Sequence, residues 1–146
     1  MTNDDNARPR ATGGCLCGSV RFEVRGPLRD VVICHCVFCQ RMHTHVGAAT
    51  ACAPSDLRII SGRTLRWYRS SPGRRRGFCR KCGSSLFWEP MPTTHISISA
   101  GSLDRPTGLK VVEHIFLAQK GDYYEVDWAK DRVSTPQSSP PFLEKS

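Results

Sequence analysis

Cys34-His35-Cys36-Val37-Phe38-Cys39 holds three of the eight cysteines in the chain and is the stretch around which we expect the fold to form. Side chains two residues apart in a strand share a face, so Cys34 and Cys36 should point the same way and His35 the opposite way. Cys39 returns to their face if the backbone coils into a helical turn after Cys36. Three thiolates on a tetrahedral zinc leave one position open, so this cluster predicts a catalytic zinc site.

Two further cysteine pairs flank this cluster in the sequence, Cys15-Leu16-Cys17 and Cys79-Arg80-Lys81-Cys82. Neither pair can fill the four positions of a zinc ion alone, but together they supply four thiolates. We therefore assign the two pairs to a closed structural site, whose metal-binding free energy becomes folding free energy. The spacing also permits a partition in which the second pair joins Cys34 or Cys36. Two zinc ions per chain are expected, one held by Cys15, Cys17, Cys79 and Cys82 and one by Cys34, Cys36 and Cys39.

Four other residues are candidates for a fourth ligand at the middle cluster: Cys52, His35, His43 and His45. Cys52 is better explained as a small buried apolar side chain. Each histidine is better explained as a surface or hydrogen-bonded residue. His43 and His45 are also candidates to move a proton beside the open position, because imidazole titrates near physiological pH.

A chain of 146 residues has the length of one domain. We expect a single zinc-binding domain over residues 13–132, with flexible tails at 1–12 and 133–146. The sequence lacks an apolar run of the ~20 residues needed to cross a bilayer, and its polar N-terminus does not resemble a secretion signal. These features predict a soluble, cytoplasmic protein. Disulfides rarely persist in that compartment, so closely spaced cysteines indicate metal ligands.

The apolar pattern predicts a mostly β fold. Val20, Phe22 and Val24 alternate with charged residues, and Ile96 and Ile98 alternate with serines, as in half-buried strands. Strands are predicted over residues 20–24, 30–35, 46–52, 56–61, 64–69, 76–79, 85–89, 95–100 and 111–117, with a short helix or turn over 36–42.

The formal net charge of +8 suggests an anionic partner. Arg74-Arg75-Arg76, followed by Arg80-Lys81, is the strongest local sign of anion binding, although a solvated loop explains it equally well. No aromatic residues are interleaved with this run, as they are in single-strand binders. A basic zinc module that contacts nucleic acid or protein, with both zincs structural, is therefore the alternative function, and nucleic acid is the less favoured partner.

Three cysteine clusters in this order and spacing form a specific signal. With them in view, the chain resembles the glutathione-dependent formaldehyde-activating enzyme family, which also includes centromere protein V. The matching pieces cover about residues 13–117 and are Gly14-Cys15-Leu16-Cys17-Gly18-Ser19-Val20-Arg21-Phe22, Cys34-His35-Cys36-Val37-Phe38-Cys39-Gln40-Arg41, Gly77-Phe78-Cys79-Arg80-Lys81-Cys82-Gly83-Ser84-Ser85-Leu86, Gly101-Ser102-Leu103-Asp104 and His114-Ile115-Phe116.

The resemblance implies a β-tent fold of packed antiparallel sheets. It also implies a structural zinc at the first and third cysteine clusters and a zinc centre for a thiol adduct at the middle one. The family activity joins glutathione and formaldehyde into S-hydroxymethylglutathione, classed as a carbon-sulfur lyase reaction, so a small-molecule thiol such as glutathione is the expected partner. Arg41 or the Arg74-Arg75-Arg76 run would favour capture of that anionic thiol. One departure lies after the middle cluster, where Thr44 stands in place of the glycine that we expect from the family.

Overall fold

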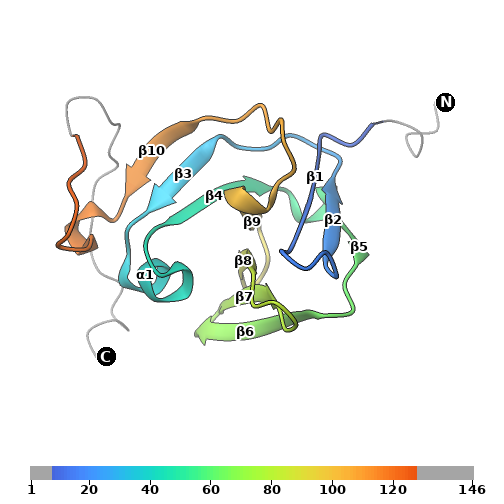
Figure 1. The fold of residues 1–146 in the computed structure, drawn as a ribbon, viewed down its shortest axis with the longest axis horizontal. Coiled ribbons are helices and arrows are strands. Elements are labelled where there is room, and N and C mark those ends of the chain that lie inside the picture. Colours follow the sequence, from blue (N-terminus) through green and yellow to red (C-terminus); the bar gives the residue numbers. More distant parts are fainter. Residues whose placement is uncertain (1–7, 128–146) are drawn as a thin grey trace. The chain divides into compact units, whose positions relative to one another are not determined.

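The computed structural model describes residues 8–127, and the chain in it divides into two compact units. Unit 1 comprises residues 1–29 and 51–107, and unit 2 comprises residues 30–50 and 108–146. The elements of both are labelled in Figure 1. The predicted tail 133–146 lies outside the described residues, and the single domain over 13–132 stays a prediction.

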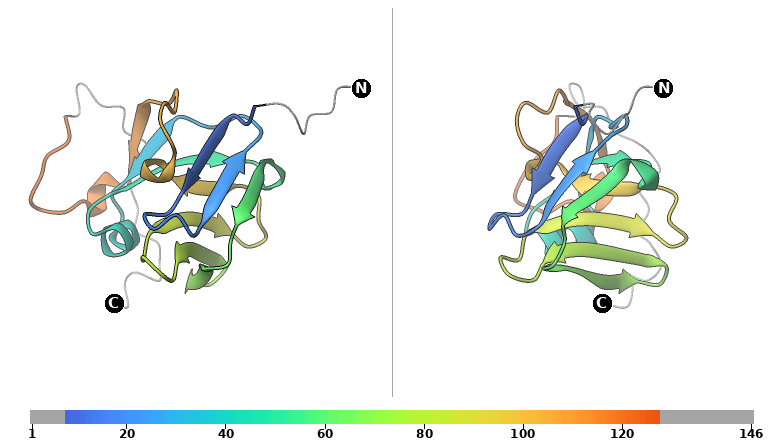
Figure 2. Two further views of the ribbon diagram at one scale, coloured as in Figure 1. Left: turned by 45° about the vertical axis from the view of Figure 1, so that its right-hand side comes forward. Right: turned by 90° about the vertical axis from the view of Figure 1, so that its right-hand side faces the viewer.

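Unit 1 contains a three-stranded antiparallel sheet in the order β1-β2-β5, whose strands lie side by side in Figure 2. These strands are β1 (Ala11–Gly14), β2 (Arg21–Val24) and β5 (Leu57–Ser61), and the short 3-10 helix η2 (Pro54–Asp56) leads into the last. Strand β2 buries Phe22 and Val24 and leaves the charged residues Arg21 and Glu23 partly exposed, as the alternation predicts. Strand β1 was not predicted, and it begins two residues before the expected tail boundary, because its pairing with β2 orders a glycine-rich segment that has no apolar alternation.

Four further strands of unit 1 form an antiparallel meander: β6 (Leu65–Ser71), β7 (Arg74–Cys79), β8 (Ser85–Pro90) and β9 (Ile96–Ser99). One face of this meander packs on the three-stranded sheet, where the rings of Phe22 and Phe87 meet edge to face with centroids 5.1 Å apart. Val20, Leu86 and Ile98 are fully buried. The 3-10 helix η3 (Ala100–Ser102) follows β9, and Leu103 then bridges back to Gly13 of β1.

Unit 2 contains β3 (Val31–Cys34), helix α1 (Val37–His43), the start of β4 (Gly47–Cys52), β10 (Val111–Ile115) and the 3-10 helix η4 (Leu117–Gln119). Strand β3 pairs antiparallel with β4 and parallel with β10. This parallel pair is an exception within sheets whose other described pairings are antiparallel. It arises because the chain reaches β10 by a long connection from the other unit, whereas β3 and β4 are joined only by α1.

The predicted mostly β fold is therefore confirmed, and each predicted strand and the short helix has its counterpart in the structure. The last strand ends two residues early, because Phe116 adopts a left-handed conformation (φ 57°) that terminates β10 before η4. The cysteine turns described below occupy strand ends in both units.

Candidate metal centres

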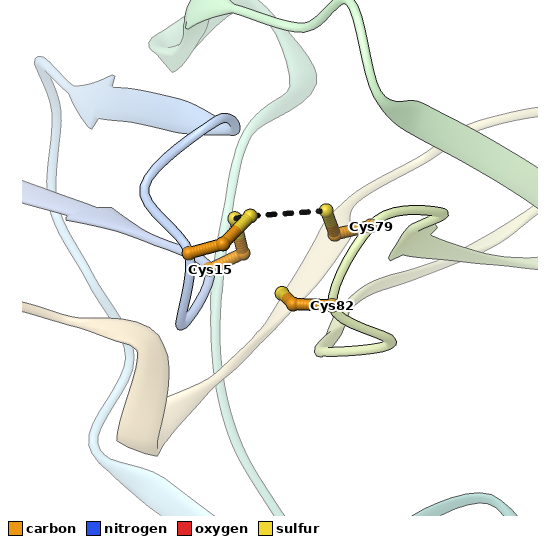
Figure 3. Close-up of side chains that lie close together, drawn as sticks. Cys15, Cys79 and Cys82 are labelled. Carbon is orange, nitrogen blue, oxygen red and sulfur yellow. Dashed lines mark hydrogen bonds between the residues drawn. The ribbon is translucent and has the colours of Figure 1, made fainter.

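The first cluster brings together two cysteine pairs that lie 62 or more residues apart in the chain. Cys15 and Cys17 follow β1, Cys79 ends β7, and Cys82 lies in the turn before β8. Their four sulfurs lie within 4.8 Å of one another, and Figure 3 shows the labelled side chains converging on one point. The structure therefore groups the first cysteine pair with the last, as in the first of the two predicted partitions.

The sulfur spacing fits a zinc ion. A zinc–sulfur bond of about 2.3 Å in a tetrahedron places neighbouring sulfurs about 3.8 Å apart. The sulfurs of Cys15 and Cys17 are 3.6 Å apart, and those of Cys17 and Cys79 are 3.8 Å apart. All eight cysteines of the chain are free thiols. The cluster can hold zinc with little rearrangement, and the assignment of its members as zinc ligands stays a prediction.

Two similar turns shape this cluster. Gly18 and Gly83 each have φ of 81°, a left-handed conformation that glycine adopts without steric cost. The amide of Gly18 donates to the carbonyl of Cys15 (3.1 Å), and the amide of Gly83 donates to that of Cys79 (2.8 Å). Each turn thereby directs its cysteine side chains toward the same point.

Hydroxyl groups surround the sulfurs of this cluster. Ser19 Oγ lies 2.9 Å from the sulfur of Cys17, Thr64 Oγ1 lies 3.3 Å from that of Cys79, and Ser84 Oγ lies 3.2 Å from that of Cys82. We did not predict these hydroxyl contacts. A sequence signal for two of them exists, because Cys-Gly-Ser occurs at both 17–19 and 82–84.

These contacts favour the thiolate forms that bind metals. Burial opposes ionisation of Cys79, but hydrogen bonds from Ser19 and Thr64 outweigh it and lower the Cys79 pKa to about 5. The hydrogen bond from Ser84, helped by backbone donors, lowers the pKa of Cys82 to about 7. Both shifts favour the ionised sulfur that a cation binds.

The second cluster is built by the end of β3 and the start of α1. Cys34 is the last residue of β3, Cys36 is the N-cap of α1, and Cys39 lies in the first helical turn. The sulfur of Cys36 accepts a hydrogen bond from the amide of Cys39 (3.4 Å). The three sulfurs lie within 4.8 Å of one another, as the predicted helical turn requires.

A bound cation would relieve repulsion within this second cluster, and Gly47 lies directly against it. Hydrogen bonds of the Cys34 thiol with the sulfurs of Cys36 and Cys39 raise its pKa, and burial and repulsion between neighbouring thiolates add to the rise. A bound dication would remove that repulsion. A Cβ atom on Gly47 would lie 2.9 Å from the sulfur of Cys39 and 3.2 Å from Cδ2 of His43. Only glycine allows β4 to start this close to the cluster.

His35 is not a member of the cluster, because its ring faces away and is fully engaged. Its Nδ1 contacts the hydroxyl of Tyr124 at 2.5 Å, and its Nε2 contacts Nδ1 of His114 at 2.9 Å. Burial, reinforced by the nearby His114, His45 and Lys120, lowers the pKa of His35 to about 4. The neutral ring thus ties β10 and the segment after η4 to the cysteine-bearing loop, a function that the sequence pattern did not reveal.

The other candidates for a fourth ligand also lie outside the cluster. Nδ1 of His45 contacts the hydroxyl of Tyr123 at 2.5 Å. Cys52 is buried, and that burial raises its pKa to about 11, which supports its assignment as a small apolar side chain. His43 lies beside the cluster, since its ring and the sulfur of Cys39 both lie close to Gly47.

Thr44, which stands where the family pattern has glycine, adopts a backbone conformation typical of glycine. Thr44 is the C-cap of α1 and adopts the left-handed conformation, with φ of 60°, at the position where helices most often use glycine. Its hydroxyl donates to the carbonyl of His43 at 2.6 Å. The turn therefore keeps the glycine-type geometry despite the substitution, and the loop around the second cluster carries two imidazoles.

The arginine run is not a loop, because residues 74–76 form the start of β7. Arg74 is exposed, Arg75 is ion-paired with Glu89, and Arg76 is buried. The run therefore does not form a continuous basic surface of the kind that binds a nucleic-acid backbone.

Comparison with known proteins agrees with this architecture. No curated protein matches the chain in sequence. Among solved structures, a Rhodobacter sphaeroides protein determined by structural genomics is 27% identical, with a TM-score of 0.56, and the match covers 68% of this chain and 97% of that one. No helix among residues 8–127 is long and apolar enough to cross a membrane. The sequence model described as glutathione-dependent formaldehyde-activating enzyme matches residues 10–119, so the chain belongs to that family.

Proposed function

We propose that this protein is a zinc-dependent carbon-sulfur lyase-type enzyme that joins glutathione and formaldehyde into S-hydroxymethylglutathione. One observation carries the proposal. The cluster of Cys34, Cys36 and Cys39 has no fourth cysteine, histidine or carboxylate ligand among residues 8–127, whereas the other cluster has four. A three-thiolate site retains a position for substrate, and a four-thiolate site does not.

Cys34, Cys36 and Cys39 would hold the zinc ion, which would accept a substrate sulfur and lower the pKa of that thiol. In the reaction the thiol sulfur attacks the carbon of formaldehyde and a carbon–sulfur bond forms. The electron pair of the carbonyl π bond moves to oxygen, and that oxygen takes up the proton that the thiol lost. Atoms and charge balance without an oxidant or reductant.

Residues of the chain provide the sulfur ligands, the proton carrier and the contacts that position the loop. Cys36 and Cys39 are buried, so two of the three ligands are shielded from bulk water. His43 is the proposed proton carrier, because its ring lies beside Cys39 against Gly47. His35 positions the loop, since it is held neutral between Tyr124 and His114.

The structure weakens the main argument for the alternative function, a basic module that contacts nucleic acid, because that argument depends on the arginine run. Of the three consecutive arginines, Arg75 is occupied by Glu89 and Arg76 is buried. A nucleic-acid site would need several exposed cations along one surface. The enzyme interpretation needs only the open cluster.

The test is the rate of S-hydroxymethylglutathione formation with purified, zinc-loaded protein. We expect acceleration over the spontaneous reaction, abolished in Cys36→Ser while that variant retains the zinc of the four-cysteine cluster. A rate equal to the spontaneous one would reject the substrate assignment. Nucleic-acid affinity that falls steeply with salt would favour the alternative.

A further inference from the structure

Cys17 is the one exposed cysteine of the chain. Of the eight cysteines, all of which lie within residues 8–127, five are buried, Cys34 and Cys82 are partly exposed, and only Cys17 is exposed. The rest of its turn is open as well, since Leu16 is 89% exposed and a Cβ atom on Gly18 would meet nothing within 4 Å. A small reagent in the solvent therefore reaches Cys17 more readily than any other cysteine.

Burial distinguishes Cys17 from the other members of its cluster. Cys79 is fully buried, Cys15 is 8% exposed, and Cys82 is partly exposed. In the three-cysteine cluster, by contrast, no member is exposed. The four-cysteine cluster has no open position for a ligand, but it presents the more accessible sulfur to a reagent that attacks thiolates.

The sulfur of Cys79 is placed to bond to that of Cys17. The two sulfurs lie 3.8 Å apart across the two turns of the cluster. The hydroxyl of Ser19 contacts both, at 2.9 Å from Cys17 and 3.5 Å from Cys79. The sulfur of Cys15 is also near, at 3.6 Å, but a bond between Cys15 and Cys17 would close a ring over a single residue, which opposes the preferred disulfide geometry. A Cys17–Cys79 bond of about 2.05 Å requires each sulfur to move by only about 1 Å.

We propose that Cys17 is an oxidation site at which a hydroperoxide converts the four-cysteine cluster into a Cys17–Cys79 disulfide and thereby releases its zinc. A sulfur that binds zinc is deprotonated, and a thiolate is the form that attacks a peroxide. The Cys17 sulfur bonds to one peroxide oxygen, the O–O bond breaks, and a sulfenic acid and a hydroxide form. The Cys79 sulfur then attacks the Cys17 sulfur, forms the S–S bond and expels a second hydroxide.

The electrons and atoms of this reaction balance. The two sulfurs lose two electrons, and the peroxide gains them and becomes two hydroxides, each of which takes a proton from the solvent. With two of its four sulfurs in a disulfide, the cluster no longer supplies a tetrahedral set of ligands. The folding free energy that the metal contributes is lost with the ion. The site would therefore couple peroxide to the stability of unit 1, whether or not the protein catalyses the formaldehyde reaction.

The test is titration of the zinc-loaded protein with hydrogen peroxide, followed by a chromogenic zinc chelator and by disulfide mapping with mass spectrometry. We expect the first zinc to be released in step with the appearance of a bond between the peptides that contain Cys17 and Cys79. A dithiol together with added zinc should reverse both changes, because thiol–disulfide exchange restores the two thiolates. A sample without peroxide measures the zinc that the chelator removes unaided.

Cys17→His and Cys82→His form a matched pair of variants, because each replaces one sulfur of the cluster by a nitrogen that can bind zinc. Cys17→His removes the exposed sulfur and should release zinc to peroxide about tenfold more slowly than wild type. Cys82→His keeps both Cys17 and Cys79 and should release zinc at least as fast as wild type. Equal release rates for the two variants would overturn the assignment of Cys17.

Disulfide mapping of the wild-type protein decides the proposal even if a variant fails to fold or to bind zinc. A first disulfide among Cys34, Cys36 and Cys39, or a bond from Cys17 to a cysteine other than Cys79, would overturn it. Zinc release without any disulfide, or no release at all, would overturn it as well. These readouts are independent of the formaldehyde reaction, so the proposed function and this oxidation site can fail separately.

Discussion

Cys82→Ser and Cys52→Ser form a pair of substitutions that distinguishes metal ligation from packing. Both replace a sulfur by an oxygen. Cys82 is half-buried in the four-cysteine cluster, whereas Cys52 is 5% exposed and lies outside both clusters. If packing alone mattered, Cys82→Ser would cost at most ~0.5 kcal/mol, as surface substitutions do. Cys52→Ser would then cost more, about 1–2 kcal/mol, because it buries a hydroxyl.

If Cys82 binds zinc, Cys82→Ser should instead cost more stability than Cys52→Ser. A structural zinc contributes about 10–16 kcal/mol to folding, so losing one of four ligands should cost about 3 kcal/mol. For a chain of this size that lowers the melting temperature by about 6–12 °C, against about 2–8 °C for Cys52→Ser. The assay is thermal unfolding of both variants with zinc present, together with zinc content by mass spectrometry. A Cys82→Ser protein that melts within about 2 °C of wild type and keeps its zinc would refute the structural site.

Three further predictions concern other parts of the two units. His43→Gln should lower kcat by about 100-fold or more with zinc content unchanged, and His45→Gln should have little effect; equal rates for both variants would exclude His43 as the proton carrier. Thr44→Gly should stabilise the protein by ~1 kcal/mol in urea unfolding, because it removes a side chain from a left-handed C-cap, and destabilisation would contradict the αL assignment. The hydrogen bond from Arg21, with that from Thr12, lowers the pKa of Asp104. The ionised Asp104 carboxylate therefore stabilises the fold above pH ~4, and this stabilisation is lost as the pH falls through the depressed pKa. Asp104→Asn should therefore lower the melting temperature slightly at pH 6 and not at pH 2, and a difference that persists at pH 2 would rule out this ion pair as its cause.

Much of the fold follows from local sequence patterns. The alternation in β2 and β9 specifies which face of each strand is buried. The turn residues between strands mark where the strands end. Strand β1 is not visible in the same way, because Gly13 and Gly14 have no side chains to alternate. Its order comes from pairing with β2 across the Cys15–Cys17 turn. The parallel pairing of β10 with β3 is likewise a long-range contact with no local signature.

The cysteine groups were predictable, but their surroundings were only partly so. Spacing favours joining the first cysteine pair to the last, because four ligands complete one tetrahedron, but it also permits Cys79 and Cys82 to join Cys34 or Cys36. The structure brings Cys79 and Cys82 to Cys15 and Cys17. The hydroxyls of Ser19 and Ser84 follow from the repeated Cys-Gly-Ser, whereas Thr64 reaches Cys79 only through tertiary packing. The arginine run misled in a simple way: three consecutive cations suggest one exposed patch, but a strand directs neighbouring side chains to opposite faces.

X-ray absorption at the zinc edge, before and after addition of glutathione, tests the central claim most directly. The claim is that the chain holds two zinc ions and that only the one at Cys34, Cys36 and Cys39 has an open position. It predicts two zincs per chain with an average of about 3.5 sulfur ligands each, rising to about 4 when glutathione binds. One zinc per chain, or four sulfur ligands per zinc before glutathione is added, would contradict it.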